Sequence, residues 1–167
     1  IVYFHGGINQ HGSGFDGIRR GDLITQNQKY PIIWINFDFR LGILGWFEMP
    51  GSNVTSNLGF LDQQAALRWV QENIAAFGGD PTRVTLQGQS EGCGTILMHY
   101  VSPTSAGLFS RAAFHSPVAD IWSRRTNEAR TKFIVEEAGC KRKELWSTMR
   151  CLRRIKAHHL WYQDWSS

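Results

Sequence analysis

A serine flanked by glycines lies near the middle of the chain, in the pentapeptide "GQSEG" at residues 88–92. An apolar run, "RVTLQG" at 83–88, precedes it, and a helical pattern follows from about residue 91 to 101. Ser90, between a strand and a helix, is suited to nucleophilic chemistry, because the N-terminus of a helix favours developing negative charge. The alternative is a plain strand-to-helix turn, since glycine and serine are common in turns.

The positions of the two glycines have a geometric explanation. A chain that reverses from strand to helix within a few residues forces its middle residue into a strained conformation. The residues two before and two after it then lie so close that a side chain would clash, which accounts for Gly88 and Gly92. We therefore predict that Ser90 stands above the carboxyl end of a sheet.

A second segment with matching chemistry is "HGG" at residues 5–7, directly after the apolar run "IVYF" at 1–4. Acyl transfer to a serine needs N–H donors aimed at the anionic oxygen of the tetrahedral intermediate. A glycine-rich loop after an early strand can provide such donors, together with the residue after the serine. The two segments follow two predicted strands, in the order that this chemistry requires.

The elements that must position these segments alternate between strand and helix. Apolar strands without strict polar alternation are typical of a parallel sheet covered by helices on both faces. The fold class is therefore predicted to be α/β, in one domain over residues 1–167, with no second domain. The expected strands are 1–4, 31–39, 83–88 and 111–116, and the expected helices are 60–77, 91–101, 126–139 and 142–163, with a short helix around 20–28 and a loop at 40–50.

Composition narrows the class of protein. The chain of 167 residues is 42% hydrophobic with a net charge of +4, which suits a packed domain and gives only mild attraction to nucleic acid. Positive residues gather after residue 123 but are interspersed with glutamates, as on a solvated helix face. No stretch approaches the ~18 apolar residues of a membrane span, and no set of His, Cys and carboxylate residues has metal-ligand spacing. We expect no metal, cofactor or nucleic-acid partner.

Several stretches resemble the type-B carboxylesterase/cholinesterase family almost position by position, and together they cover nearly the whole chain. The resemblance implies an α/β-hydrolase fold and hydrolysis of small-molecule carboxylic esters through a serine acyl-enzyme. Carried over by position, Ser90 is the nucleophile, and the N–H groups of Gly7, Ile8 and Glu91 form the oxyanion hole. The matching stretches are "VYFHGG", "FRLGILGWF", "NLGFLDQQAALRWVQENIAAFGGDPTRVTLQGQSEG", "VSPTSAGLFSRAAFHS" and "AGC…MRCLRR".

The sequence departs from the family pattern at the expected site. The family usually has Gly-Glu-Ser-Ala-Gly where this chain has "GQSEG". The Glu91 carboxylate could approach the forming oxyanion and oppose it, although a negative charge is favourable at a helix N-terminus. Ile8 replaces the third glycine of the oxyanion loop and narrows the acyl side of the pocket. Gln89 replaces a charged group that helps cholinesterases to hold cationic substrates, which argues against choline esters.

A serine triad also needs a carboxylate and a histidine, which follow the serine in this fold. Four histidines follow Ser90, but none lies in the family's histidine context: His99, His115, His158 and His159. The chain begins "IVYFHGG", without an initiator Met and inside an expected core strand. We therefore expect an N-terminal catalytic portion of a longer protein, lacking the C-terminal part of the fold and inactive on its own.

Two other functions stay open. A catalytically inactive, cholinesterase-like adhesion module keeps the fold and loses the chemistry, and a truncated product has no function. Ser90 and the oxyanion glycines favour the enzyme, whereas Ile8 and Glu91 leave room for the binding module. A histidine on a late loop of the complete protein would decide for the enzyme.

The resemblance also implies a disulfide between Cys140 and Cys151, which fall where the family has a disulfide-closed loop. The alternative is a pair of unbridged thiols, and Cys93 is expected to be a small buried residue. A disulfide favours a secretory compartment. The triplet that begins at Asn53, "NVT", is an N-glycosylation sequon in an expected loop, which supports a secreted protein.

Overall fold

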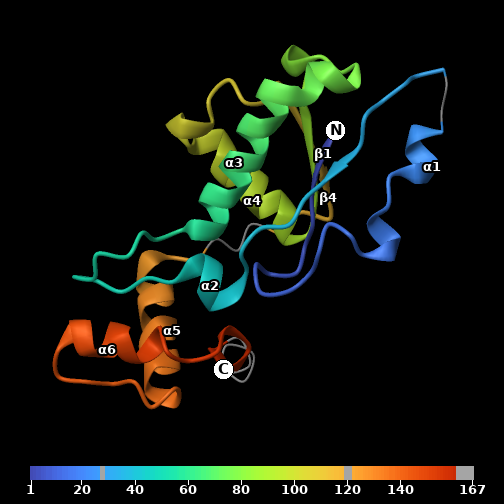
Figure 1. Ribbon diagram of the computed structural model, residues 1–167. Helices are drawn as coiled ribbons and strands as arrows, with labels where there is room; N and C mark the ends of the chain where they lie inside the picture. Colours follow the sequence, from blue (N-terminus) through green and yellow to red (C-terminus); the bar gives the residue numbers. More distant parts are fainter. Residues whose placement is uncertain (27–28, 119–121, 161–167) are drawn as a thin grey trace. The chain divides into compact units, whose positions relative to one another are not determined.

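The computed structural model describes residues 1–26, 29–118 and 122–160, and its strands form a parallel four-stranded sheet (Figure 1). The strand order is β2-β1-β3-β4, and the register pairs Val2 with both Ile35 and Leu86. Parallel strands with helical crossovers confirm the predicted α/β class. The strands are β1 (Val2–Phe4), β2 (Ile35–Asn36), β3 (Thr85–Gln89) and β4 (Arg111–His115).

Six α-helices are described, and most lie close to their predicted ranges. The helix after Ser90 begins and ends where the sequence predicts it. The predicted helix 60–77 is an α-helix that continues as a 3-10 turn over Ile74–Phe77. The α-helices are α1 (Asp22–Thr25), α2 (Gly42–Trp46), α3 (Leu58–Asn73), α4 (Glu91–Val101), α5 (Arg124–Glu137) and α6 (Leu145–Leu152).

The chain divides into two compact units. The first consists of residues 1–39 and the segment from residue 60 to the gap at 119–121, and it contains the whole sheet with α3 and α4. The second consists of residues 40–59 and the segment beyond that gap, with α2, α5 and α6. A single domain over the whole chain stays a prediction.

The core of the first unit lies between one face of the sheet and helices α3 and α4, which lie side by side (Figure 1). Residues Leu67, Val70 and Ile74 recur at helical spacing, so α3 presents one apolar ridge to the sheet. Side chains two residues apart along a strand lie on the same face of the sheet, and those on this face pack against the ridge. The buried cluster comprises Val2, Phe4, Leu67, Val70, Ile74, Val84, Leu86 and Ile96.

Strand β2 is shorter than its apolar pattern over 31–39 predicts. Among the described strands β2 pairs with β1 alone, and β1 has three residues before the chain turns into the glycine-rich loop. Beyond that length the segment is held by other contacts: the backbone N–H of Gly14 and the hydroxyl of Ser13 both donate to the Asp38 carboxylate. Strand length is therefore set by the neighbour and not by the local pattern.

The expectation of a loop at 40–50 is wrong, because Gly42–Trp46 form helix α2. Gly42 has a positive φ of 55°, which admits a sharp entry to the helix. A Cβ on Gly45 would lie 2.1 Å from the Arg40 carbonyl oxygen, so this glycine allows a close backbone approach. Ile43 is buried and anchors the helix. Here the glycines permit packing, whereas the sequence analysis took them as loop residues.

The predicted helix 142–163 is also wrong in its extent, because α6 covers only Leu145–Leu152. Its predicted start carries Lys141, Arg142 and Lys143, and positive charge is unfavourable at a helix N-terminus. The helix ends in a tight turn in which the Arg154 N–H donates to the Cys151 carbonyl. Residues 161–163 of the prediction lie outside the described part of the chain.

The second unit contains the disulfide Cys140–Cys151, whose Cα atoms lie 5.5 Å apart. This confirms the predicted pairing, which ties the end of α6 to the segment after α5. The bridge lies in an apolar cluster of Ile43, Ile134, Val135, Cys140, Leu152 and Leu160. None of the described helices is long and apolar enough to cross a membrane.

Candidate active site

Ser90 lies at the junction of β3 and α4 in an unusual backbone conformation. Its φ is 55° and its ψ is −125°, a region that residues with a side chain rarely occupy. The hydroxyl does not cap α4, and among the residues that the structure describes it makes no hydrogen bond. Ser90 is half-buried. A strained, unpartnered hydroxyl at a helix N-terminus is the geometry that the pentapeptide predicts.

Three glycines allow the backbone to close around this serine. A Cβ on Gly88 would lie 2.6 Å from the carbonyl carbon of Gly92, and a Cβ on Gly92 would lie 2.2 Å from the carbonyl oxygen of Phe4. A Cβ on Gly6 would lie 2.9 Å from the Cβ of Ser90. The glycine-rich loop after β1 and the turn after β3 therefore meet, as the sequence analysis expects.

The loop after β1 is itself strained. Three consecutive residues have positive φ: Gly7 at 121°, Ile8 at 50° and Asn9 at 58°. Such a value is a clear outlier for a β-branched residue such as Ile8. The Gly7 carbonyl accepts from the N–H groups of Gln10 and His11. Within residues 1–26, 29–118 and 122–160, the N–H groups of Gly7 and Ile8 donate no hydrogen bond.

Glu91 is the first residue of α4, and its side chain is almost fully buried, at 4% exposure. Its Oε1 accepts a hydrogen bond of 2.8 Å from the Asn9 side-chain amide. A Cβ on Gly94 would lie 3.2 and 3.3 Å from the two carboxylate oxygens, so the carboxylate lies along the first turn of α4. No motif in the sequence predicts this contact, which supplies the Glu91 carboxylate with a hydrogen-bond donor.

The far side of the turn is held by β4. The Ser90 N–H donates to the His115 carbonyl over 3.0 Å, which extends the β3–β4 ladder by one residue. Cys93 is buried and unbridged, as predicted, and its thiol lies 3.1 Å from the Gly88 carbonyl oxygen. Burial raises the pKa of the Cys93 thiol, which disfavours the reactive thiolate. Cys93 therefore packs beneath Ser90 and does not compete with it.

His99 is a structural residue within the core of the first unit. It is buried, and its Nδ1 lies 2.8 Å from the Ser105 hydroxyl, while its Nε2 lies 3.3 Å from the Gln63 amide oxygen. Burial lowers its pKa to about 4. Its ring stacks on Phe60 at a centroid distance of 4.4 Å. Both ring nitrogens are engaged, so His99 does not serve as a base for Ser90.

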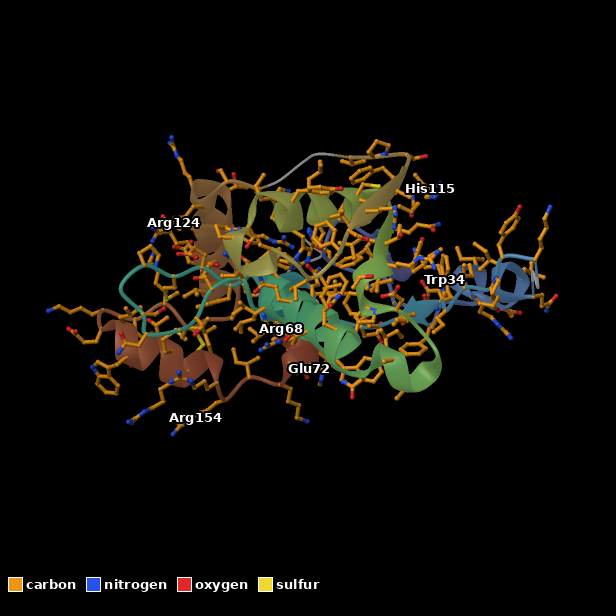
Figure 2. All side chains as sticks on the ribbon, turned by 90° about the horizontal axis from the view of Figure 1, so that it is seen from above. Trp34, Arg68, Glu72, His115, Arg124 and Arg154 are labelled. Carbon is orange, nitrogen blue, oxygen red and sulfur yellow. A yellow bond between two sulfur atoms is a disulfide. The ribbon has the colours of Figure 1, made fainter. Side chains whose placement is uncertain are left out.

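The other histidines of the first unit do not partner Ser90 either. His5 is buried, its Nδ1 lies 2.8 Å from the Gly6 carbonyl oxygen, and its ring stacks on Phe39. Burial lowers the pKa of His5. His115 is exposed at the end of β4 (Figure 2). Among the described residues of the first unit, no histidine is hydrogen-bonded to the Ser90 hydroxyl. In the described part of the chain, no group of three or more His, Cys, Asp and Glu residues could hold a metal ion.

Asn9 is the residue of this region that the sequence analysis missed. It lies in a polar stretch after the glycines, with no motif to mark it. The available signal was the position of Asn9 directly after the glycine-rich segment, because asparagine tolerates the left-handed region better than other non-glycine residues. A glycine-rich loop that must curl could therefore have pointed to it, but its bond to Glu91 joins residues 82 positions apart.

The comparisons with known proteins agree with this geometry. The Carboxylesterase family matches residues 1–167. A parallel α/β sheet with a strained serine at a strand-to-helix turn is thus found in a chain that belongs to the carboxylesterase family.

Three relatives illustrate the similarity. An acylcarnitine hydrolase of Mus musculus is 42% identical over 158 residues, which cover 92% of this chain and 27% of that protein. Esterase E4 of Myzus persicae is 38% identical over 155 residues, 92% of this chain and 27% of that protein. Acetylcholinesterase 4 of Caenorhabditis briggsae is 32% identical over 170 residues, 99% of this chain and 28% of that protein. The chain spans about a quarter of the length of these relatives.

Proposed function

We propose that the complete protein hydrolyses carboxylic esters, with Ser90 as nucleophile. The observation that carries this proposal is the backbone of Ser90, at φ 55° and ψ −125°, enclosed by glycines that admit no Cβ. A fold retains such strain where the surrounding structure enforces it, and these sites are commonly functional. Membership of the carboxylesterase family and relatives named as esterases support the same reaction.

In the first half-reaction, Ser90 Oγ attacks the acyl carbon of the ester while a base takes the hydroxyl proton. The carbonyl oxygen becomes an oxyanion, and the proposed donors to it are the N–H groups of Gly7, Ile8 and Glu91. Loss of one such donor typically lowers the rate by about 10²–10³-fold. The base returns its proton to the alcohol oxygen, the ester C–O bond breaks, and the acyl group stays on Ser90.

In the second half-reaction, water attacks the acyl carbon and the same donors hold the second oxyanion. The acid product leaves and the Ser90 hydroxyl regains its proton. No histidine among the described residues of the first unit is hydrogen-bonded to the Ser90 hydroxyl, and no histidine after Ser90 lies in the family's histidine context. We therefore propose that the base and its carboxylate partner come from outside residues 1–167. The greater length of the relatives leaves room for both.

The proposed substrate is a small carboxylic ester. Ile8 has a half-exposed side chain next to the proposed donors, at 49% exposure, where it would limit the size of the acyl group. Gln89, at the end of β3, puts no charge beside the serine, so cationic alcohols gain no electrostatic attraction there. We expect uncharged esters with short acyl chains to be hydrolysed better than choline esters.

We further propose that the protein matures in the secretory pathway. The disulfide Cys140–Cys151 supports this, because such bridges persist in oxidising compartments and are rare in the cytosol. The exposed sequon at Asn53 is consistent with the same route.

The test uses the full-length protein, a p-nitrophenyl acetate assay and a serine-directed phosphonate. Turnover and labelling at Ser90 are expected, and both should vanish in Ser90→Ala. Ser116→Ala is a matched control, because Ser116 also has a positive φ of 48° but is exposed beyond β4. It should keep both signals. Absence of turnover and of labelling in the folded wild-type protein would overturn the proposal and favour a binding module.

A further inference from the structure

The buried Glu91 carboxylate raises a question about how this site tolerates a negative charge. An ionised carboxylate removed from water is strongly destabilising unless it is hydrogen-bonded or paired. The side chain is 4% exposed and receives the Asn9 amide over 2.8 Å. Its place at the first turn of α4 adds the favourable field of the helix N-terminus.

The loop that carries Asn9 needs an anchor. Positive φ at three residues in succession is a costly arrangement, because two of these residues, Ile8 and Asn9, are not glycine. Asn9 tolerates this conformation, whereas Ile8 does not. The Asn9 side chain reaches across to α4, so one hydrogen bond joins the strained loop to the helix that follows Ser90.

The direction of the Glu91 side chain matters for chemistry. Both carboxylate oxygens lie beside Gly94, one turn along α4. The proposed oxyanion would lie at the Glu91 backbone N–H, which is at the start of the helix. A carboxylate held along the helix by Asn9 adds less negative potential at that point than one free to turn back.

We propose that Asn9 and Glu91 form a positioning pair, which fixes the Gly7–Ile8 donors against α4 and holds the Glu91 carboxylate away from the oxyanion. This inference rests on the proposed function. Neither residue is assigned a bond-making step. The pair sets the distance between the two sources of N–H donors, the loop after β1 and the N-terminus of α4.

The proposal predicts a defined pattern of kinetics for substituted full-length protein. Asn9→Asp sets a second carboxylate against Glu91 and displaces the donors without removing one, so kcat should fall about 10- to 100-fold, up to the lower limit for complete loss of an oxyanion donor, with little change in KM. Glu91→Gln alone should be milder. The double variant N9D/E91Q reverses donor and acceptor across the same contact, and should recover kcat to within about 3-fold of wild type.

Asn57→Asp is the matched control. Asn57 also has a positive φ, at 56°, but is exposed before α3, so this variant should leave kcat unchanged. Full activity in Asn9→Asp would overturn the proposal. So would a double variant no better than Asn9→Asp alone, because recovery by reversal requires direct contact.

Thermal unfolding separates this inference from the proposed function. Asn9→Asp should lower Tm, and the double variant should regain most of that loss, whether or not the protein hydrolyses esters. A wild-type protein that hydrolyses no ester would contradict the proposed function but would leave the Asn9–Glu91 contact untouched. If the Tm loss of the double variant equals the sum of the losses of the two single variants, the proposal of an Asn9–Glu91 pair would be contradicted.

A different observation carries a second inference, in the second unit. The loop before α3 and helix α6 enclose a groove of about 400 Å³, lined on one side by residues 51–54 and on the other by Leu145, Trp146, Met149 and Arg153. Trp146 is 61% exposed, and the Arg150 guanidinium lies 5.0 Å from its ring centroid. Asn53, the sequon asparagine, is exposed and lines the same groove.

We propose that Asn53 carries an N-linked glycan whose first sugars lie in this groove over Trp146. Asn53 and Trp146 line the same groove, so a sugar attached to Asn53 is tethered beside the indole. The apolar face of a pyranose ring would cover the indole, while its hydroxyl groups stay in water. The glycan would thus be packed against the protein.

The test expresses the full-length protein in a secretory host and maps Asn53 by mass spectrometry before and after an N-glycosidase. Thr55→Ala should abolish the modification, and Thr55→Ser is the matched control that keeps the sequon. Hydroxyl-radical oxidation of Trp146 should rise several-fold in Thr55→Ala and stay low in Thr55→Ser. An unmodified Asn53 would overturn the proposal. So would equal oxidation of Trp146 with and without the glycan.

Discussion

At the residue scale, Ser90 combines a left-handed φ with a hydroxyl that makes no hydrogen bond among the described residues, so it should reduce stability. Such strain costs about 1–3 kcal/mol, and glycine relieves it. Ser90→Gly is therefore expected to unfold at a higher urea concentration than Ser90→Ala. Its free energy of unfolding should be larger by about 1 kcal/mol after the greater chain entropy of glycine is counted. Equal stability of the two variants would mean that the φ of 55° is not strained in this setting.

Gly92 tests the close approach between the two loops. A methyl group there would lie 2.2 Å from the Phe4 carbonyl oxygen, which belongs to a buried strand and cannot move easily. Gly92→Ala should lower the free energy of unfolding by about 3 kcal/mol or more, at the upper end of overpacking effects. Gly17→Ala is the control, because a Cβ there meets nothing within 4 Å. Similar urea midpoints for both variants would contradict the geometry.

At the residue scale, the sequence was sufficient to predict residues whose role follows from local chain geometry. It was not sufficient to predict a residue whose role depends on a distant contact. Gly88, Gly92 and Ser90 follow from local chain geometry, which a pentapeptide can carry. Asn9 depends on a partner 82 residues away, and no local pattern encodes it. The contact between Asn9 and Glu91 could not be predicted for the same reason, since the position of a carboxylate depends on its donor.

At the element scale, α3, α4 and the turn after α4 are joined by a chain of buried polar groups. The Gln64 amide donates to Ser105 Oγ over 2.9 Å, and Ser105 in turn contacts His99 Nδ1. Because the Gln63 oxygen can only accept, His99 Nε2 carries the proton and Nδ1 accepts from Ser105. The network thus needs a neutral imidazole.

This network predicts a pH-dependent stability. The pKa of His99 falls from its usual 6.5 to about 4 in the folded protein, so the unfolded chain binds more protons between these values. The full stability is present above pH 6.5 and is lost as pH falls towards 4, by about 3 kcal/mol at 1.36 kcal/mol per pKa unit. Urea titrations of wild type and His99→Gln should show a smaller loss in the variant. The exposed His115→Gln should retain the wild-type loss.

Elements with a strong local signal were predicted well. Helix α4 is bounded by the strained serine at one end and a proline at residue 103 near the other, and both boundaries are legible in the sequence. Helix α2 was missed because its two glycines permit a buried approach to Arg40 that composition alone cannot distinguish from a loop. Strand β2 was overestimated because its length depends on the three residues of β1.

At the scale of the whole molecule, the disulfide is a major stabilising link of the second unit. Closing a loop of 11 residues between Cys140 and Cys151 should contribute roughly 3 kcal/mol by restricting the unfolded chain. Replacing both cysteines by serine should lower Tm, and reductant should lower the wild-type Tm towards that of the variant. Reductant should not affect the variant. Peptide mapping without reduction should recover Cys140 joined to Cys151 and Cys93 as a free thiol.

A polypeptide of residues 1–167 alone is expected not to turn over esters, although it contains Ser90. A serine hydroxyl is a weak nucleophile unless a base takes its proton, and no histidine among the described residues of the first unit is hydrogen-bonded to it. An oxyanion hole and binding alone leave about 10³–10⁴-fold acceleration over water, which a p-nitrophenyl acetate assay would scarcely register. Turnover abolished by Ser90→Ala would instead place a base within these residues, with His115 and His158 the first to substitute.

The strand order also has a consequence for how the protein is made. β1 lies inside the sheet, yet its partner Leu86 in β3 follows Val2 by 84 positions. At about 5–20 residues per second, a ribosome delivers β3 roughly 4–17 s after β1. During that interval β1 can pair only with β2, through the two positions Val2–Ile35 and Tyr3–Asn36. Nascent β1 thus offers an open edge to chaperones, and Ser90 reaches its strained geometry only after β3 has inserted on the other side of β1.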